Sequence, residues 1–280
     1  MTAAVLPLPS PPPAAHLIVF RGANPEYVAV FVEGPDDVET WKPWLKWRPF
    51  PAGGCGPVLA AVASLRAIGE SGYVGILDAD CARLEGRDHS AADVIVTEHH
   101  DLECDLLQLP ALEKLLGVVE DGLVATLSGP KSFRDAVVER ALPFGLLRWH
   151  FFRRGTEYQH GRLSPHHFID KHTWVLDEEL LLREASEVLV QSVADLKREV
   201  ITLRKRASSP WNICNGHDLL CVLAIAFRGP LAAAKQFPQS TALSTSLRLA
   251  VDARDLDSLS VWRALRAWET ANQPWVACRR

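Results

Sequence analysis

The sequence predicts an α/β fold, a parallel sheet flanked by helices and followed by a mainly helical region. Two patterns predict it. In the first half, short apolar runs rich in valine alternate with helix-length segments, as in buried parallel strands. From Lys131 onward the periodicity is mainly helical. At 280 residues, 48% hydrophobic and 23% charged, the chain is long enough to bury a core of ordinary size.

Residues 1–15 are expected to form a disordered, proline-rich tail, because five prolines interrupt them. This stretch has no Lys or Arg, so it lacks the basic region of a signal peptide. No apolar run approaches the roughly 20 residues that span a bilayer. We therefore expect a cytoplasmic protein. Its six cysteines include no CxxC pair and are expected to be reduced thiols.

Strand and helix patterns alternate after this tail. Strand patterns cover residues 27–32, 47–50, 73–77 and 93–96. Helix patterns begin at Pro35, before Val58 and after Asp101, and Gly69 ends the second of them. We assign residues 16–110 to an α/β domain and residues 111–280 to a mainly helical domain. Helix patterns in the second domain cover residues 133–142, 177–206, 218–227 and 247–268.

Acidic residues gather where three of the predicted strands end. They are Glu33 and Asp37, Asp78 and Asp80, and Asp101 and Glu103. Ligands of parallel α/β sheets bind outside the carboxyl ends of the strands, so these carboxylates are expected to converge. Such a cluster repels itself without a countercharge, and ligands that are all oxygen favour Mg²⁺ or Mn²⁺ over zinc. The alternative is that the acids lie on separate surfaces, as single DxD motifs often do.

The charge distribution separates the two halves of the chain. The net charge of −4 argues against a protein that coats nucleic acid through a large basic excess. From Glu33 to Asp105 there are 14 acidic and 6 basic residues, whereas from Lys131 to Arg206 there are 14 basic and 11 acidic ones. This asymmetry is expected where carboxylates hold a metal and other surfaces hold phosphate.

Four segments carry a family resemblance. Residues 30–37 (VFVEGPDD) and 75–80 (GILDAD) resemble the Toprim signature, in which one strand ends in Glu-Gly and a later strand ends in Asp-x-Asp. Residues 97–103 (TEHHDLE) and 215–220 (NGHDLL) resemble small OLD-like Toprim proteins, a class of unknown function encoded beside ABC-type ATPases in phage-defence islands. The resemblance is fairly specific over residues 28–107, and beyond them it rests on short sequence motifs.

The resemblance implies a metal-dependent nuclease that hydrolyses phosphodiesters without a covalent protein nucleophile. It also implies an antiviral-defence effector with a toxic activity that a partner ATPase restrains. The chain has no Gly-x-x-x-x-Gly-Lys-Ser/Thr loop to bind a nucleotide itself. A topoisomerase is disfavoured because it needs a positioned tyrosine and further domains, and a primase because no zinc-binding module precedes residue 28.

The resemblance also implies roles for single residues. Glu33 would be the family's lone glutamate, a metal ligand or general acid/base, and Asp78 and Asp80 would be its metal-binding pair. Asp37 matches a further carboxylate of OLD-type sites. A second metal site would need Asp101 or Glu103, and the lysine that neutralises transition-state charge would be Lys171.

His217 lies in a Gly-His-Asp word at a helix start and could orient phosphate. We favour a plain helix cap by Asp218 at this point. The histidine pairs at 99–100 and 166–167 are not expected to bind zinc, because adjacent residues of a strand face opposite ways and no cysteine pair accompanies them. The tryptophans at 41, 44 and 47 could stack on bases, but we favour a place in the core or in a dimer interface.

Residues 177–206 carry more apolar positions than one narrow helical stripe requires. We therefore predict a homodimer, or a complex with an ATPase, through the helical half, with the acidic site facing a cleft. The alternative is that these leucines pack within one chain. The basic end of this segment, Arg204 to Arg206, matches a helix C-terminus and could also contact phosphate.

Two other functions fit the same residues. One is a binding or regulatory module that keeps a Toprim fold without turnover, and the other is a housekeeping RNA-processing Toprim enzyme. The retention of Glu33, Asp78 and Asp80 together argues against the first. The sequence does not distinguish DNA from RNA as the substrate.

Overall fold

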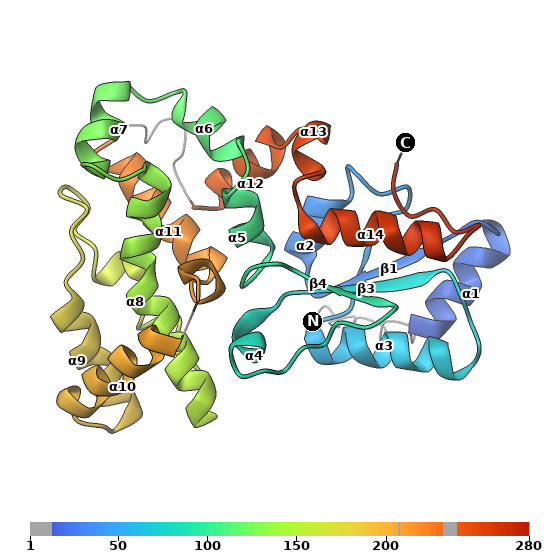
Figure 1. Cartoon of the computed structure of the whole chain (residues 1–280), viewed down its shortest axis with the longest axis horizontal. Coiled ribbons are helices and arrows are strands. Elements are labelled where there is room, and N and C mark those ends of the chain that lie inside the picture. The colour runs from blue at the N-terminus through green and yellow to red at the C-terminus, as the bar shows by residue number, and fades with distance from the viewer. Residues whose placement is uncertain (1–12, 207, 232–239, 280) are drawn as a thin grey trace, which may run out of the picture. The chain divides into compact units, whose positions relative to one another are not determined.

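The structure is a computed structural model that describes residues 13–206, 208–231 and 240–279 (Figure 1). The described chain divides into two compact units. Unit 1 takes its residues from Met1–Leu77, His89–Val96 and Val261–Arg280, and unit 2 takes its residues from Asp78–Asp88 and Thr97–Ser260. The expected α/β class with a helical region is confirmed. The expected boundary near residue 110 differs from this division, because residues 78–88 and 97–110 pack with the helical part.

Unit 1 contains a sheet of four parallel strands among the described residues, in the order β2-β1-β3-β4. The strands are β1 (Ala29–Val32), β2 (Phe50–Pro51), β3 (Tyr73–Leu77) and β4 (Val94–Val96). Phe31 pairs with Phe50 on one side and with Gly75 on the other, and Gly75 pairs with Val94. Every residue of β1 and β3 is buried, which explains why both strands read as unbroken apolar runs.

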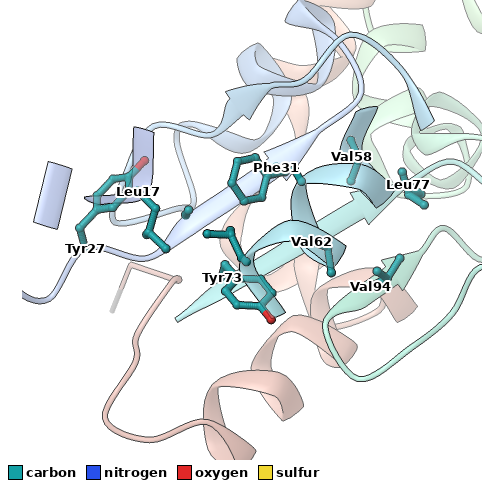
Figure 2. Packing of buried hydrophobic residues seen from close by; sticks show 11 residues of the cluster. Leu17, Tyr27, Phe31, Val58, Val62, Tyr73, Leu77 and Val94 are labelled. Atoms are coloured by element: carbon teal, nitrogen blue, oxygen red, sulfur yellow. The ribbon is translucent and has the colours of Figure 1, made fainter. Parts of the chain in front are cut away.

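Helix α3 (Cys55–Ala67) covers the sheet with Val58, Val62 and Leu65. Figure 2 shows Val58 and Val62 in one buried cluster with Phe31 of β1 and Leu77 of β3. A side chain on Gly75 would bring its Cβ to 2.8 Å from Val58 Cγ1, so the glycine is what allows this close approach of helix and strand. The predicted helix before Gly69 is therefore confirmed.

Unit 1 has two further helices near β1. Helix α1 (Pro13–Ala23) precedes this strand, and α2 (Pro35–Trp41) follows it. The predicted tail of residues 1–15 is wrong at its end, because α1 already begins at Pro13, and proline suits the first turn of a helix. Residues 1–12 lie outside the described residues. Trp41 is 2% exposed, in agreement with the core placement favoured for this tryptophan.

Helix α14 (Ser260–Ala271) and the residues after it pack on unit 1. The ring of Trp262 stacks on Trp41 with 6.4 Å between centroids, and Cys278 forms a β-bridge with Leu45. The sequence placed these residues in the helical domain. Helical periodicity shows which face of a helix is apolar but does not show which partner will cover it.

Unit 2 is almost entirely helical. Its helices are α4 (Asp80–Leu84), α5 (Leu102–Leu107), α6 (Ala111–Leu116), α7 (Asp121–Ser128), α8 (Phe133–Arg154), α9 (Glu178–Leu189), α10 (Val193–Arg206), α11 (Gly216–Arg228), α12 (Ser240–Ala250) and α13 (Ala253–Leu256), with short 3₁₀ turns η1 (Pro165–His167) and η2 (Pro210–Asn212). Helices α8 and α11 lie side by side at its centre (Figure 1). Within the described residues, no helix is both long and apolar enough to cross a membrane.

Three predicted helices have different lengths in the structure. Helix α8 continues through Pro143 to Arg154, because its residues beyond the proline are largely buried. The segment 177–206 is two helices separated at Val190, whose φ of 51° lies in the left-handed region. Leu181, Leu196 and Leu203 of this segment are buried within unit 2. The apolar face offered as a reason for dimerisation is therefore largely covered within the chain. The third, 247–268, is interrupted between α12 and α14.

Candidate active-site pocket of unit 2

The loops that follow β3 and β4 are bonded to each other within unit 2. The first contains Asp78 and Asp80, and the second runs from Thr97 to Asp101. Three hydrogen bonds join them: Ala79 N to Thr97 Oγ1 (2.9 Å), Asp80 N to His100 O (2.7 Å) and Leu102 N to Asp78 Oδ1 (3.1 Å). The expectation that residues after these two strands lie together therefore holds for this pair of loops.

Asp80 has an unusual backbone and an unusual carboxyl group. Its φ of 49° lies in the left-handed region, where non-glycine residues are uncommon and where they concentrate at functional sites. Its side chain is 52% exposed and its Oδ1 lies 3.6 Å from His100 Nε2. The protein around the carboxyl displaces water and raises its pKa, Asp101 adds to this effect, and His100 and Arg148 oppose it. Asp80 therefore holds a proton more readily than an ordinary aspartate.

His100 is 3% exposed, and both of its ring nitrogens have polar neighbours. Nδ1 lies 3.3 Å from the carbonyl oxygen of Asn212, and Nε2 faces Asp80. When Nδ1 carries the proton and donates to this carbonyl, Nε2 presents its lone pair toward the Asp80 carboxyl. At 3.6 Å the two groups are farther apart than a hydrogen bond, so they stand as a neighbouring acid and base, the two kinds of group that general acid/base catalysis uses.

Asp80 and His100 line a cavity of about 340 Å³, which we call the Asp80 pocket. Its other walls are built from α8, from the segment after it and from the residue before α11. They include Arg148, Phe152, Tyr158, His160 and Asn215. The pocket thus combines an acid and a histidine on one side with an arginine, a tyrosine and a second histidine on the other.

Arg148 is fixed by a buried ion pair. Its Nη2 donates to Asp218 Oδ1 over 2.8 Å, and its Nε donates to the other oxygen of the same carboxylate. Burial opposes the charge of Arg148, but the hydrogen bonds and the charge of Asp218 outweigh it, so the pKa is raised. The guanidinium carbon also lies 4.2 Å from the centroid of the Tyr158 ring. Arg148 is therefore a permanent cation in a set position.

His160 is held beside this arginine. Arg148 Nη1 lies 3.1 Å from His160 Nδ1, and burial and the neighbouring guanidinium lower the pKa of His160. A neutral imidazole can accept the hydrogen bond from Arg148 and leave its other nitrogen as a donor. This wall of the pocket therefore offers hydrogen-bond donors that suit phosphate oxygens.

Two of the predicted metal ligands have structural partners in unit 2. Asp101 caps α5: Oδ1 accepts from Cys104 N over 2.9 Å, and Oδ2 accepts from Gly216 N over 2.6 Å. Glu103 is 6% exposed, and its Oε1 lies 3.2 Å from Arg248 Nη2. Both carboxylates thus join α5 to other parts of unit 2.

The two other predicted carboxylates belong to unit 1. Glu33 follows β1 and is partly buried, and its main-chain carbonyl accepts hydrogen bonds from Gly53 N (2.9 Å) and Gly54 N (3.0 Å). Asp37 lies in the first turn of α2, where its Oδ2 accepts from Gly34 N over 2.8 Å. The strand before Glu33 is the sheet neighbour of the strand before Asp78.

Within the described residues of unit 2, the predicted carboxylates do not gather into a metal centre. Among the described residues, no group of three or more His, Cys, Asp or Glu side chains could hold a metal ion. Unit 2 contributes Asp78 and Asp80 from one loop, whereas Asp101 and Glu103 have other partners. The binding of Mg²⁺ or Mn²⁺ therefore stays a prediction.

Lys171 and His217 lie outside the Asp80 pocket. Lys171 lines a different pocket, together with His166 and Arg228. His217 is exposed in the first turn of α11.

The expected cap by Asp218 is wrong. The side chain of Asn215 caps α11 by accepting from His217 N over 3.1 Å. Asp218 instead lies inside the helix, 3% exposed and paired with Arg148, because a buried arginine from α8 needs a counterion.

Sequence reasoning missed most of this pocket. His100 was considered only as half of a histidine pair, although its neighbour His99 faces elsewhere and binds Asp105 Oδ1 over 2.7 Å. Arg148 sits in the buried stretch of α8, where an isolated arginine among apolar residues is a usable signal of a buried ion pair. Tyr158 and His160 lie in a loop with no pattern that marks them.

No protein-family model matches the chain, and neither a curated protein nor a solved structure matches it.

Proposed function

We propose that the chain is a hydrolase of nucleic-acid phosphodiesters and that the Asp80 pocket is its active site. One observation carries the proposal: two strand-end loops hold the Asp80 carboxyl and the His100 imidazole 3.6 Å apart in a pocket whose far wall presents Arg148 and His160. An acid with a raised pKa and an imidazole side by side, next to fixed donors for an anionic group, suit phosphoryl chemistry.

The pocket residues have distinct roles in this proposal. The Asp80–His100 pair takes a proton from the attacking water or gives one to the leaving oxygen. Arg148 and His160 bind the phosphate oxygens, whose negative charge increases in the transition state. Asp218 is a positioning residue, because it holds the Arg148 guanidinium in one orientation.

The Toprim resemblance supports the same reaction class. It adds expectations that remain part of the proposal: a requirement for Mg²⁺ or Mn²⁺, a role for Glu33, and a function as an antiviral-defence effector restrained by an ABC-type ATPase. Bound metal would supply activation of water and stabilisation of the leaving oxygen. Both the homodimer and the ATPase complex stay predictions, which light scattering and co-purification with the ATPase test.

A nuclease assay with matched variants tests the proposal. Single-stranded DNA, duplex DNA, tRNA and rRNA are each incubated with the purified protein in Mg²⁺, in Mn²⁺ and in chelator. Asp80→Asn and His100→Asn are expected to lower the cleavage rate about 100-fold or more, which is the contribution of a positioned acid or base. The controls His99→Asn, whose ring faces Asp105, and Asp88→Asn, an exposed acid of the same unit, should cleave at close to the wild-type rate.

Wild-type cleavage by Asp80→Asn and His100→Asn would remove the active site from this pocket. If the folded protein binds these nucleic acids but cleaves none of them under any of the three conditions, the hydrolase proposal fails and the chain is a binding module.

A further inference from the structure

The pocket that contains Lys171 has chemistry of its own. It encloses about 570 Å³ and is lined by His166, Lys171, His172 and Arg228 together with Ile169, Ile225 and Gly229. We call it the cationic pocket. It lies at the C-terminal end of α11, whereas Asn215 of the Asp80 pocket precedes the N-terminal end of that helix. Helix α11 has 13 residues and so is about 20 Å long, which makes the two pockets separate sites.

The loop that carries Lys171 and His172 is held in place by its neighbours in the sequence. Asp170 Oδ1 accepts hydrogen bonds from His172 N (2.9 Å) and Thr173 N (2.7 Å). Trp174 is fully buried, and its Nε1 donates to the carbonyl of Val222 in α11 over 2.9 Å. These contacts anchor the main chain of the loop on α11, and the exposed side chains of Lys171 and His172 extend from this fixed backbone.

Gly229 brings this loop and the helix end together. A Cβ on Gly229 would overlap the main-chain carbonyl of Lys171, so only glycine permits the approach. Arg228 is the residue before it, and its Nη2 lies 3.4 Å from Nδ1 of His166 in η1. Two stretches of unit 2, residues 166–172 and the end of α11, therefore place basic side chains around one cavity.

The cations of this cavity lack an acidic neighbour. Among the described residues no carboxylate lines it, and no ion pair joins Lys171 or Arg228 to an acid. The Asp170 carboxylate accepts from its own loop. Burial, Arg228 and His167 lower the pKa of His166, as expected for an imidazole among cations. The helix C-terminus accounts for Arg228 but not for the basic side chains of residues 166–172.

We propose that the cationic pocket is a phosphate-binding site, distinct from the Asp80 pocket. A phosphate offers several acceptor oxygens, which matches a lysine, an arginine and two histidines that converge on one cavity. The phosphate could belong to a nucleic-acid backbone or to a small phosphorylated molecule. The inference does not depend on hydrolysis at Asp80.

Binding measurements on the full chain test the proposal. We use the Asp80→Asn protein, so that no substrate is consumed. It is titrated with inorganic phosphate, AMP and a single-stranded oligonucleotide. Calorimetry follows binding, and NMR follows the ring signals of His166. Each phosphate-bearing probe that binds is expected to shift the ring signals of His166 and to raise the pKa of this histidine. Lys171→Ala and Arg228→Ala should each weaken binding about tenfold, which is typical of losing one charge-assisted hydrogen bond.

Matched variants separate a site from general charge. Lys197→Ala removes one exposed lysine of α10 outside the pocket and should leave affinity within about twofold, as for an unrelated surface charge. Lys171→Arg and Arg228→Lys keep the charge and should retain most of the binding. If Lys171→Ala and Arg228→Ala weaken the binding of AMP and inorganic phosphate but not that of the oligonucleotide, the pocket binds a small phosphorylated molecule. If they weaken the binding of the oligonucleotide, the pocket binds a nucleic-acid backbone.

The proposal is overturned if inorganic phosphate and AMP leave the His166 signals unchanged, or if Lys171→Ala, Arg228→Ala and Lys197→Ala weaken binding equally. Either result is independent of the cleavage assay, because these titrations measure no turnover.

Discussion

Asp80 combines two features that each cost stability at a surface position. Its left-handed backbone is tolerated better by Asp and Asn than by most residues, and its carboxyl has a raised pKa. Asp78, two residues earlier, instead accepts a hydrogen bond from Leu102 N. The two aspartates of the DxD motif therefore have different neighbours, and Asp80 has the environment of an acid/base residue.

The raised pKa gives a pH-dependent prediction for Asp80→Asn. Between the ordinary value of 3.8 and the raised value, the folded chain binds more protons than the unfolded chain, so the contribution of Asp80 to the free energy of unfolding falls as the pH rises. Asparagine keeps the backbone conformation and has no charge to bury. We expect the variant to match the wild type at pH values below the ordinary pKa and to be relatively more stable at neutral pH.

Urea unfolding of both proteins across that pH range measures this difference. Asp88→Asn, which changes an exposed acid of the same unit, is the control and should show no comparable trend. A difference between Asp80→Asn and the wild type that is constant with pH would mean that the fold does not perturb the Asp80 carboxyl.

At the scale of secondary structure, the N-terminal ends of α5 and α11 contact each other within unit 2. Gly216 starts α11, donates its N–H to Asp101 and leaves no room for a side chain, because a Cβ there would overlap Asp101 Oδ1 and the Cβ of Glu103. The structure therefore explains three residues of the Asn-Gly-His-Asp motif. Asn215 caps α11, Gly216 permits the close approach of α5, and Asp218 pairs with Arg148.

Gly216→Ala is therefore expected to destabilise the protein by about 2 kcal/mol or more, in the range of overpacked cores. Gly56→Ala is the matched control: this residue lies inside α3 with open space around it, and alanine there should raise stability by about 0.5–1 kcal/mol. Thermal unfolding of the two variants beside the wild type shows whether crowding or helix propensity governs Gly216. Equal effects of the same sign would show that helix propensity, and not crowding, governs Gly216.

Strands β1, β3 and β4 and helices α2, α3, α5 and α11 could be predicted because each depends on a local pattern, whereas β2 shares only Phe50 with its predicted range. The buried run from Tyr73 to Leu77 matches β3 at both ends, and Pro35 marks the start of α2. Patterns that depend on distant contacts were not predictable. Nothing near Pro143 shows that α8 continues beyond it, since the stabilising burial comes from other segments. The same limit applies to the Asp80 pocket, because Arg148 and His160 reach it from parts of the chain far from the DxD motif.

At the scale of the whole molecule, the two units interleave along the chain. Unit 1 needs α14, whose Trp262 stacks on Trp41, and unit 2 needs Trp174, which is fully buried and bonded to α11. Each tryptophan belongs to the core of one unit, so substitution should weaken the two units separately.

Trp262→Ala and Trp174→Ala test this division. Removing a buried tryptophan typically costs about 3–5 kcal/mol. We expect Trp262→Ala to lower hydrogen-exchange protection most in β1 and β3, and Trp174→Ala to lower it most in α8 and α11. Exchange measured by mass spectrometry under native conditions resolves both regions. Equal loss of protection in both units from either variant would mean that they unfold as one.

The interleaving also determines when each unit can fold during translation. Both excursions of the chain into unit 2 leave from the ends of adjacent strands, and the ribosome must make all of Thr97–Ser260 before α14 emerges. At about 5–20 residues per second, the strands of unit 1 wait many seconds for the helix that covers Trp41. A nascent chain that ends before Val261 therefore has all four strands of the sheet and all of unit 2, but Trp41 still lacks the helix that stacks on it. Chaperones that bind exposed apolar side chains would act on this protein mainly before Val261 is added.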